Sequence, residues 1–484
     1  MVKGHGIQLS GSVEDLQRIL GSPVLSASSP SFFSEMTWDN RQNPSDLFVA
    51  IRGTAFDGVD SIPQMIQSGV LGIVSETKPP QGTPENLTWW HVENSREAFA
   101  HLVQHAFRDP GKDQQVFGIT GTNGKSSTVR MLASILEVSG CNTGWITTVD
   151  QKVAGESSES SCTTPSADVL ASSLRRHVDD GGRSMVLEIS SHAIHQHRTT
   201  GIPLVSAAVT QLGRDHLDYH QTVTEYHQVK KSLQHQVKAG GFFLLPTDPL
   251  EKTEDVAFVD VFSQGRWGGK IIERTSRGIR ASLHGPRLEL ELDFPRPAIH
   301  DLSNALCAAI LAISAGASTE EIRQGLEISR PVPGRLEEVA EGIFVDYAHT
   351  PDALEAVLKA SREFCSGDLR VVFGCGGDRD RGKRPEMGRI AARHADEVYL
   401  TDDNPRSESS TQILQQIRGG MGSHPRVIES TNRRDAIAAA IHQHQTDDIL
   451  IIAGKGHETT QEIQGELTPF DDRQVVRDIL GVVT

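Results

Sequence analysis

The sequence predicts an α/β protein of three domains. Its 484 residues are too many for a single hydrophobic core, and a prior of about 150 residues per domain gives roughly three. Short apolar runs alternate with helix-length segments along most of the chain, as expected for parallel sheets with crossover helices. A Gly-rich turn between a strand-like run and a helical pattern, within residues 116–136, predicts a phosphate-binding loop in the middle domain.

The first domain is expected to span residues 1–110. Strand-like runs at 46–51 and 69–74 and a helical stretch at 96–108 predict a small α/β fold. The polar segment 109–113 contains a helix-breaking proline, so we place the boundary there.

The middle domain is expected to span residues 111–333 and to contain a parallel sheet. Strand-like runs at 116–119, 185–189 and 206–210 alternate with helical patterns, the last of them at 304–312. This order is typical of a phosphate-loop ATPase-like fold.

The third domain, residues 334–484, is expected to be Rossmann-like. Prolines and a glycine at 331–334 break the preceding pattern. Beyond them, helix-length segments separate strand-like runs at 343–346, 369–373, 397–400 and 449–453. Ligands of open sheets of this kind bind beyond the carboxyl ends of the strands.

The phosphate loop gives the clearest chemical prediction. Gly121 and Gly124 allow backbone N–H groups to turn toward an anion, and the following helix adds the positive end of its dipole. Lys125 can reach a β- or γ-phosphate, and Ser126 offers a hydroxyl to Mg²⁺. Ile119 occupies the position of a glycine in the strict motif, so the loop is a variant, and an ordinary Gly-rich turn is the alternative. The expected ligand is a nucleoside triphosphate.

The composition argues against several classes of protein. A formal charge of −16 argues against a broad basic surface for nucleic acid, and no apolar run approaches the roughly 18 residues of a membrane helix. The N-terminus lacks an apolar signal core, and the five cysteines are scattered without a Cys-x-x-Cys pair. We therefore expect a cytoplasmic protein without disulfides or a zinc site.

Further polar residues follow the expected strands. Glu188 ends one strand, where a second Mg²⁺ ligand is wanted. Residues 214–220 combine charges with imidazoles, and Lys230 and Lys231 lie on the next expected helix. The third domain has polar loops at 379–384, 403–406 and 454–458. Solvation explains each of these features alone, but not easily all of them together.

In combination, these segments resemble the Mur ligases. The shared motifs are Gly-Thr-Asn-Gly-Lys-Ser at 121–126, Glu-Ile-Ser-Ser-His at 188–192, Arg-Asp-His-Leu-Asp at 214–218, Val-Asp-Tyr-Ala-His-Thr-Pro-Asp at 345–352 and Asp-Asn-Pro-Arg at 403–406. The resemblance covers nearly the whole chain, since Asp-Leu-Phe-Val-Ala at 46–50 is similar to the family's uridine-binding domain. Within the family, the chain resembles the tripeptide synthases of the MurE type.

The resemblance implies an ATP-dependent acid–amino acid ligase. Such an enzyme adds the third amino acid to UDP-N-acetylmuramoyl-L-alanyl-D-glutamate through an acyl phosphate, in peptidoglycan precursor synthesis, and uses ATP and Mg²⁺. Residues 403–406 resemble the motif of ligases that add meso-diaminopimelate. A physical reason supports this choice: Arg406 can bind, through two parallel hydrogen bonds, the second carboxylate that meso-diaminopimelate has and lysine lacks. We expect a monomer without a membrane or nucleic-acid partner.

The resemblance also implies roles for individual residues. The catalytic residues would be Lys125, Glu188, His216 and Lys230, and the metal site would contain Ser126, Glu188, His216 and a carbamylated Lys230. The implied ATP contacts are Gly121, Thr122, Asn123, Gly124, Lys125, Ser126, Ser127, Asn304, Arg335, Asp346 and His349. The implied contacts of the UDP-muramoyl dipeptide are Asn40, Thr54, Ala55, Phe56, Thr163, Thr164, Ser190, Gln196 and Arg198. The implied pocket for the incoming amino acid contains Arg384, Asp403, Asn404, Pro405, Arg406, Gly454 and Glu458.

Three departures from the family pattern concern nucleotide contacts. Asn40 stands where the family usually has serine, Gln211 where asparagine is usual, and Ile299-His300 where Phe-Asn is usual.

Four alternatives remain open at this point. A folylpolyglutamate synthase shares the phosphate loop but usually lacks the uridine-binding domain and the Asp-Asn-Pro-Arg pocket. The others are the same ligation with L-lysine, a phosphate-loop ATPase that drives motion or assembly, and a non-catalytic nucleotide-binding scaffold.

Overall fold

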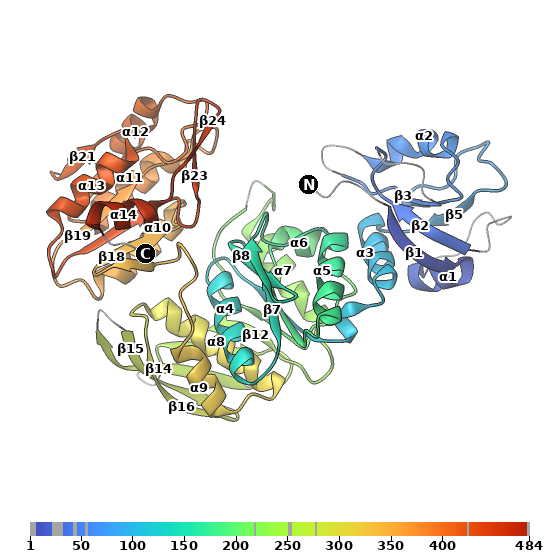
Figure 1. Ribbon diagram of the computed structural model, residues 1–484, viewed down its shortest axis with the longest axis horizontal. Coiled ribbons are helices and arrows are strands. Elements are labelled where there is room, and N and C mark those ends of the chain that lie inside the picture. Colours follow the sequence, from blue (N-terminus) through green and yellow to red (C-terminus); the bar gives the residue numbers. More distant parts are fainter. Residues whose placement is uncertain are drawn as a thin grey trace.

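The protein folds into three α/β units that follow one another along the chain, and the central unit lies between the other two (Figure 1). The computed structural model describes residues 6–21, 32–41, 46–53, 57–216, 219–249, 254–275, 278–423 and 425–481. The three-domain α/β architecture predicted from the sequence is confirmed, whereas the boundaries at 110 and 333 stay predictions. In these described ranges, no helix is long and apolar enough to cross a bilayer.

The N-terminal unit contains a five-stranded sheet in the order β1–β2–β3–β4–β5. Its strands are β1 Ile7–Ser12, β2 Phe32–Thr37, β3 Leu47–Val49, β4 Gly72–Ser75 and β5 Thr88–His91, and its helices are α1 Val13–Leu20, α2 Ile62–Gln67 and α3 Ser95–Ala106. Strands β2 to β5 pair in parallel. The strands expected at 46–51 and 69–74 and the helix expected at 96–108 are present.

The central unit has an eleven-stranded sheet with a parallel centre, in the order β12–β11–β6–β10–β7. These strands are β6 Gln115–Thr120, β7 Thr143–Ile146, β10 Ser184–Glu188, β11 Ser206–Val209 and β12 Phe243–Thr247. The helices of the unit are α4 Lys125–Val138, α5 Ala167–Asp179, α6 Ser191–His195, α7 Val223–Ser232, α8 Ile299–Ala315 and α9 Thr319–Glu327. These five parallel strands are the part of the sheet that corresponds to the expected phosphate-loop fold.

Both edges of this sheet are antiparallel, a feature that we did not predict from the sequence. The edge strands are β8 Asp150–Val153, β9 Glu156–Glu159, β13 Val256–Asp260, β14 Arg266–Thr275, β15 Gly278–Gly285 and β16 Leu288–Phe294. In β16, apolar residues are buried and the acidic residues between them are exposed. The period of two that marks such a strand is present in Leu-Glu-Leu-Glu-Leu-Asp-Phe and was missed.

The C-terminal unit has a six-stranded sheet in the order β17–β18–β22–β19–β20–β21, in which only β17 is antiparallel. The strands are β17 Glu337–Ala340, β18 Ile343–Asp346, β19 Leu369–Phe373, β20 Glu397–Leu400, β21 Val427–Glu429 and β22 Ile449–Ala453. The helices are α10 Pro351–Arg362, α11 Lys383–His394, α12 Ser410–Gly419, α13 Arg433–Gln443 and α14 Asp472–Leu480, and a hairpin is formed by β23 Thr460–Ile463 and β24 Glu466–Pro469. The expected Rossmann-like fold and its four expected strands are present.

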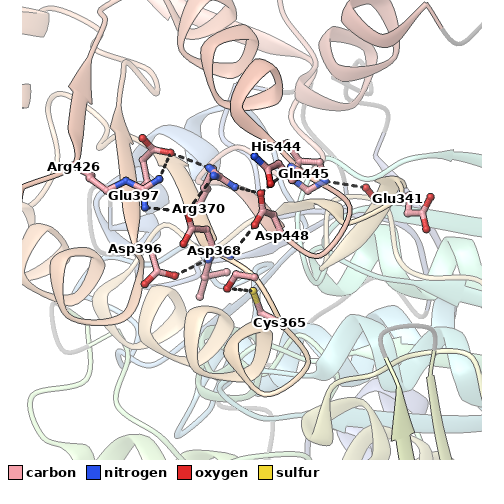
Figure 2. Close-up of polar contacts among 12 residues, drawn as sticks. Glu341, Cys365, Asp368, Arg370, Asp396, Glu397, Arg426, His444, Gln445 and Asp448 are labelled. Atoms are coloured by element: carbon pink, nitrogen blue, oxygen red, sulfur yellow. Dashed lines mark hydrogen bonds and ion pairs between the residues drawn. The ribbon is translucent and has the colours of Figure 1, made fainter.

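A buried ion-pair network ties together the amino ends of three of these strands (Figure 2). Arg370 in β19 donates from Nε to Glu397 of β20 at 2.8 Å, and its other nitrogens pair with Asp448, just before β22, and with Asp368. Removing one partner of a buried ion pair typically costs about 3–5 kcal/mol. The network therefore fixes how the strands align, and their opposite, carboxyl ends carry the loops 403–406 and 454–458.

Candidate active site

The phosphate loop connects β6 to α4 at the carboxyl edge of the parallel strands. Gly121 and Gly124 have φ angles of 149° and 82°. A Cβ atom on Gly121 would lie 2.0 Å from Thr210 Oγ1, and one on Gly124 would lie 2.2 Å from Asn304 Oδ1. Only glycine allows the loop to pack this closely against its neighbours in this conformation.

Lys125, Ser126 and Glu188 lie together beside the loop, as predicted. Lys125 Nζ donates to the Thr122 carbonyl at 2.9 Å and lies 3.9 Å from Glu188 Oε1. Ser126 Oγ donates to Glu188 Oε2 at 2.7 Å, and Thr148 holds the same carboxylate through its backbone N–H and hydroxyl, both at 2.9 Å. Burial lowers the pKa of Lys125, and the charge of Glu188 opposes that shift.

A cavity of about 370 Å³ opens between the phosphate loop and the C-terminal unit. Its lining includes the predicted ATP contacts 122–127, Asn304, Arg335 and Asp346. Asn304 is buried, and its Oδ1 accepts a hydrogen bond from Thr128 at 3.3 Å. Its Nδ2 has no partner among the described residues, and a buried donor of this kind needs an acceptor. The oxygens of a nucleotide would supply that acceptor.

The far wall of the cavity is formed where the C-terminal unit begins. The guanidinium of Arg335 lies 4.7 Å from the ring centroid of Tyr347. Asp346 accepts backbone N–H bonds from Leu336 at 2.7 Å and from Ala348 at 2.8 Å. Burial raises the pKa of Asp346, and the charge of Arg335 opposes that shift. His349 packs beside Tyr347, with 4.4 Å between the ring centroids.

Lys230 and Lys231 are adjacent on α7, but only Lys230 is buried. Lys230 Nζ donates to the Gly121 carbonyl at 2.8 Å and lies 4.5 Å from the ring centroid of Tyr226. Burial, with a further contribution from the charge of Lys125, lowers the pKa of Lys230 to about 6. Adjacent lysines on a helix usually form a solvent-exposed face, but here only Lys231 is exposed.

His216 lies near the same aromatic ring. The ring centroids of His216 and Tyr226 are 6.3 Å apart, and His216 Nε2 lies 3.4 Å from Asp215 Oδ2. Its φ angle of 52° is unusual for a residue other than glycine. Two of the residues predicted for the metal site, His216 and Lys230, therefore lie near the ring of Tyr226.

The donors beside the phosphate loop suit Mg²⁺. This ion prefers oxygen ligands and is usually held by one or two carboxylates together with substrate phosphates and waters. Glu188 and the hydroxyl of Ser126 are such donors, 2.7 Å apart. The part of the chain that the structure describes has no cluster of three or more His, Cys, Asp or Glu side chains arranged for a metal. A metal here would therefore depend on phosphate oxygens for much of its coordination.

The residues predicted for the dipeptide end of the substrate form one hydrogen-bonded group. Thr164, Ser190, Gln196 and Arg198 are bonded to one another directly, and Thr163 is bonded to Thr148, which also bonds Glu188. Arg198 Nη1 donates to the Thr164 carbonyl at 2.7 Å, and its Nη2 donates to Gln196 Oε1 at 2.8 Å. Thr164 Oγ1 donates to the backbone carbonyl of Glu188 at 2.8 Å, which connects the group to this predicted metal ligand.

The predicted uridine contacts lie in the N-terminal unit. Asn40 Nδ2 donates to Ser61 Oγ at 2.7 Å. Thr54, Ala55 and Phe56 lie outside the described residues.

The predicted amino-acid pocket is formed by the loops after β20 and β22. Arg406 Nη1 donates to the Gly377 carbonyl at 2.9 Å, and its Nε lies 3.2 Å from Glu462 Oε2. Asn404 Nδ2 donates to Glu458 Oε2 at 2.9 Å. Gly454 has a φ angle of 112°, and a Cβ atom there would lie 2.6 Å from Asp403 Oδ2. The structure thus brings Asp403, Asn404, Arg406, Gly454 and Glu458 together.

Arg384 lies next to this pocket but is fully buried. It donates to both carboxylate oxygens of Glu408, at 3.0 and 2.9 Å, and to the Gly376 carbonyl at 3.1 Å. Its direct role in binding the amino acid stays a prediction.

Sequence reasoning missed several residues of the site. Thr148 has no distinguishing pattern, because its role depends on what the fold places beside it, whereas Tyr347 lies inside the motif at 345–352 but was not singled out. Lys455 lies inside the Gly-Lys-Gly-His-Glu loop, and its complete burial was not visible in the sequence. His457 packs 5.0 Å from the ring centroid of Tyr347, and burial lowers the pKa of its imidazole to about 4.

Comparison with known proteins agrees with this geometry. The Mur ligase middle domain matches residues 119–312, and the Mur ligase glutamate ligase domain matches residues 334–456. The UDP-N-acetylmuramoyl-L-alanyl-D-glutamate–2,6-diaminopimelate ligase of Bacillus licheniformis is 37% identical over 458 residues, which are 91% of this chain and 93% of that protein. The ligase of the same name from Coxiella burnetii is 35% identical over 465 residues, covering 91% and 94%.

A solved structure gives the same result. It is a UDP-N-acetylmuramoyl-L-alanyl-D-glutamate–2,6-diaminopimelate ligase with 27% identity and a TM-score of 0.68, and the match covers 98% of this chain and 99% of that one. Both the sequence and the fold therefore place the protein in one group: the chain belongs to the Mur ligase family.

Proposed function

We propose that this Mur ligase joins meso-2,6-diaminopimelate to UDP-N-acetylmuramoyl-L-alanyl-D-glutamate in the cytoplasm, with conversion of ATP to ADP and phosphate. Relatives named for this reaction, at 35–37% identity over 91% of the chain, support the choice of substrates. The N-terminal unit would bind the UDP group, the central unit ATP, and the C-terminal unit the incoming amino acid.

The chemistry explains why ATP is needed. A carboxylate is a poor acyl donor, so its oxygen first attacks the γ-phosphorus of ATP, which gives an acyl phosphate and ADP. The amine nitrogen then attacks the carbonyl carbon, and inorganic phosphate leaves from the tetrahedral intermediate. The main barrier is repulsion between two anions, and Lys125 reduces it because its ammonium lies within the phosphate loop.

Bound Mg²⁺ would supply further positive charge to the same phosphate oxygens. Ser126 and Glu188 would hold one ion, and His216 with Lys230 would face a second. We propose that Lys230 is carbamylated, because a protonated lysine would repel the metal whereas its carbamate is an anion. The buried Nζ of Lys230, 2.8 Å from the Gly121 carbonyl and without a carboxylate partner among the described ion pairs, supports this assignment.

The observation that carries the choice of amino acid is the position of Arg406. Its guanidinium lies at the carboxyl edge of the third sheet, 3.2 Å from Glu462 and on the same loop as Asn404, which contacts Glu458. The distal carboxylate of meso-diaminopimelate would bind Arg406, and the distal ammonium would bind Glu458. This places the other amine at the acyl phosphate.

L-Lysine is the nearest alternative substrate, since it lacks only the distal carboxylate. A folylpolyglutamate synthase is disfavoured, because this chain has the five-stranded N-terminal unit and the Asp-Asn-Pro-Arg loop that such enzymes usually lack.

A panel of amino acids tests the proposal. Purified protein with ATP, Mg²⁺ and UDP-N-acetylmuramoyl-L-alanyl-D-glutamate should release phosphate and form a tripeptide product, with a kcat/KM for meso-diaminopimelate far above that for L-lysine, L-ornithine or L-glutamate. Phosphate release without added amino acid acceptor, at the same rate as with it, would contradict a ligase and support a simple ATPase.

A further inference from the structure

The pocket proposed for the amino acid contains two ion pairs joined by one amide. Lys455 Nζ lies 2.9 Å from Glu458 Oε2, and Arg406 Nε lies 3.2 Å from Glu462 Oε2. Between the pairs, Asn404 donates from Nδ2 to Glu458 at 2.9 Å. Its Oδ1 accepts from Lys455 Nζ at 3.2 Å and from the backbone N–H of Glu462 at 3.0 Å. The two pairs are therefore held at a fixed separation.

Lys455 cannot itself bind a ligand. Its side chain is fully buried, and its ammonium donates to Glu458, Asn404 and the Thr460 carbonyl, the last at 2.7 Å. An ammonium has three protons to donate, and all three are used. A buried charge persists only when it is paired and hydrogen-bonded in this way.

The charge of Lys455 nevertheless acts on the pocket through Glu458. Both described bonds of that carboxylate, from Lys455 and from Asn404, fall on Oε2. The side chain of Glu458 is 32% exposed, and neither of these bonds uses Oε1, which leaves that oxygen free to accept a hydrogen bond from a ligand. Lys455 thus balances the charge of Glu458 without covering it.

We propose that Lys455 is a specificity-determining positioning residue, which keeps the two ion pairs balanced so that the pocket selects a zwitterionic side-chain end over a simple ammonium. This inference rests on the proposed function. Within the two ion pairs, Arg406 with Glu462 and Lys455 with Glu458, the charges sum to zero.

This balance distinguishes the two candidate substrates. A zwitterionic end can place its carboxylate at Arg406 and its ammonium at Glu458, so each charge gains a partner. A lone ammonium gains only Glu458, whose charge Lys455 already offsets, and it adds one positive charge to two ion pairs that are already neutral together.

A reciprocal pair of variants tests the proposal through the ratio of kcat/KM for meso-diaminopimelate to that for L-lysine. Lys455→Met leaves Glu458 unbalanced, so the ratio should fall about tenfold or more, mainly through KM for the amino acid. Glu458→Gln leaves Lys455 unbalanced, so L-lysine should lose more than meso-diaminopimelate and the ratio should rise at least about threefold. The double variant should return the ratio toward that of the wild type. KM for ATP should not change in any of them.

Lys231→Met is the matched control, because it removes an exposed lysine from α7, outside the pocket, and should leave the ratio unchanged. An unchanged ratio in Lys455→Met, or in Glu458→Gln if Lys455→Met does not fold, would overturn the inference. Failure of the wild-type protein to ligate meso-diaminopimelate would instead overturn the proposed function, so the two failures are distinguishable.

Discussion

Two buried lysines lie at opposite ends of the candidate site, and their surroundings differ. Lys230, next to the phosphate loop, is hydrogen-bonded to a carbonyl, and burial lowers its pKa to about 6. Lys455, in the amino-acid pocket, lies 2.9 Å from the carboxylate of Glu458. Burial disfavours a charge unless an opposite charge compensates it. Burial therefore favours the neutral, reactive amine of Lys230, whereas the ammonium of Lys455 has a carboxylate beside it.

The two lysines therefore belong to regions with different functions, the phosphate loop and the amino-acid pocket. Around the phosphate loop, residues must stabilise charge that moves between substrates during phosphoryl and acyl transfer. In the amino-acid pocket, residues must recognise charge that stays constant. Changes near the phosphate loop should therefore affect all amino acids equally, and changes in the pocket should affect one amino acid more than another.

The largest expected effect is that of Lys125→Ala. Loss of an ammonium at the phosphate oxygens should lower kcat by a hundredfold or more, about 3 kcal/mol or above. The loss should be equal for meso-diaminopimelate and for L-lysine, because the side chain lies in the phosphate loop. Steady-state phosphate release measures it, with a thermal melt to show that the variant folds. Near-normal turnover would contradict the assignment of this loop as the ATP site.

Arg406→Ala should act on discrimination instead. Its loss leaves the distal carboxylate of meso-diaminopimelate without a partner, so kcat/KM for this substrate should fall roughly a hundredfold, while the low value for L-lysine changes little. Competition between the two amino acids in one reaction measures the ratio directly. If the variant discriminated as well as the wild type, Arg406 would only brace the loop through Gly377 and Glu462.

Activity should depend on CO₂ through carbamylation of Lys230. Protein prepared in CO₂-depleted buffer should lose activity on the order of tenfold, and bicarbonate should restore it by re-forming the carbamate. Lys230→Ala should be slow with or without bicarbonate, whereas Lys231→Ala should behave as the wild type. Intact-protein mass spectrometry should detect one added CO₂ only when Lys230 is present. Activity retained in Lys230→Ala would show that the modification is not needed for catalysis.

The smallest expected effect concerns the joint between the N-terminal and central units. Asn94 Oδ1 caps α3 by accepting from the N–H groups of Arg96 and Glu97, so its Nδ2 must donate to His197 Nε2, 3.0 Å away. This bond needs a neutral imidazole, and burial lowers the pKa of His197 below its ordinary 6.5. The unfolded chain then binds the extra proton first, so stability should decrease as the pH falls below 6.5 toward the folded-state pKa.

Thermal melts at pH 7.5 and below 6 measure this pH dependence. Loss of one hydrogen bond is worth about 1 kcal/mol, or roughly 1 °C in a chain of this size. His197→Gln should show a smaller decrease of Tm on acidification than the wild type. An equal decrease in both would assign the acid sensitivity to other groups.

Local sequence patterns determined much of the fold. The strand, loop and helix around Gly121 to Ser126 follow from residues that are adjacent in the chain, and so do the runs that became β10, β11, β18, β19, β20 and β22. The antiparallel meander β13 to β16 had a readable signal as well, the alternation in β16. Motif matches then indicated which polar residues would gather at the carboxyl ends of the strands, and the structure brings most of them together.

Tertiary structure alone decided which of these polar groups are buried and what compensates them. Lys230 and Lys231 are identical in type and adjacent, but one step of about 100° around α7 buries the first and exposes the second. Lys455 is stable because Asn404, 51 residues away, comes to lie beside it. The charge state of a group depends on solvent access and on partners within a few ångströms, and these are set by packing between distant segments rather than by neighbours in the chain.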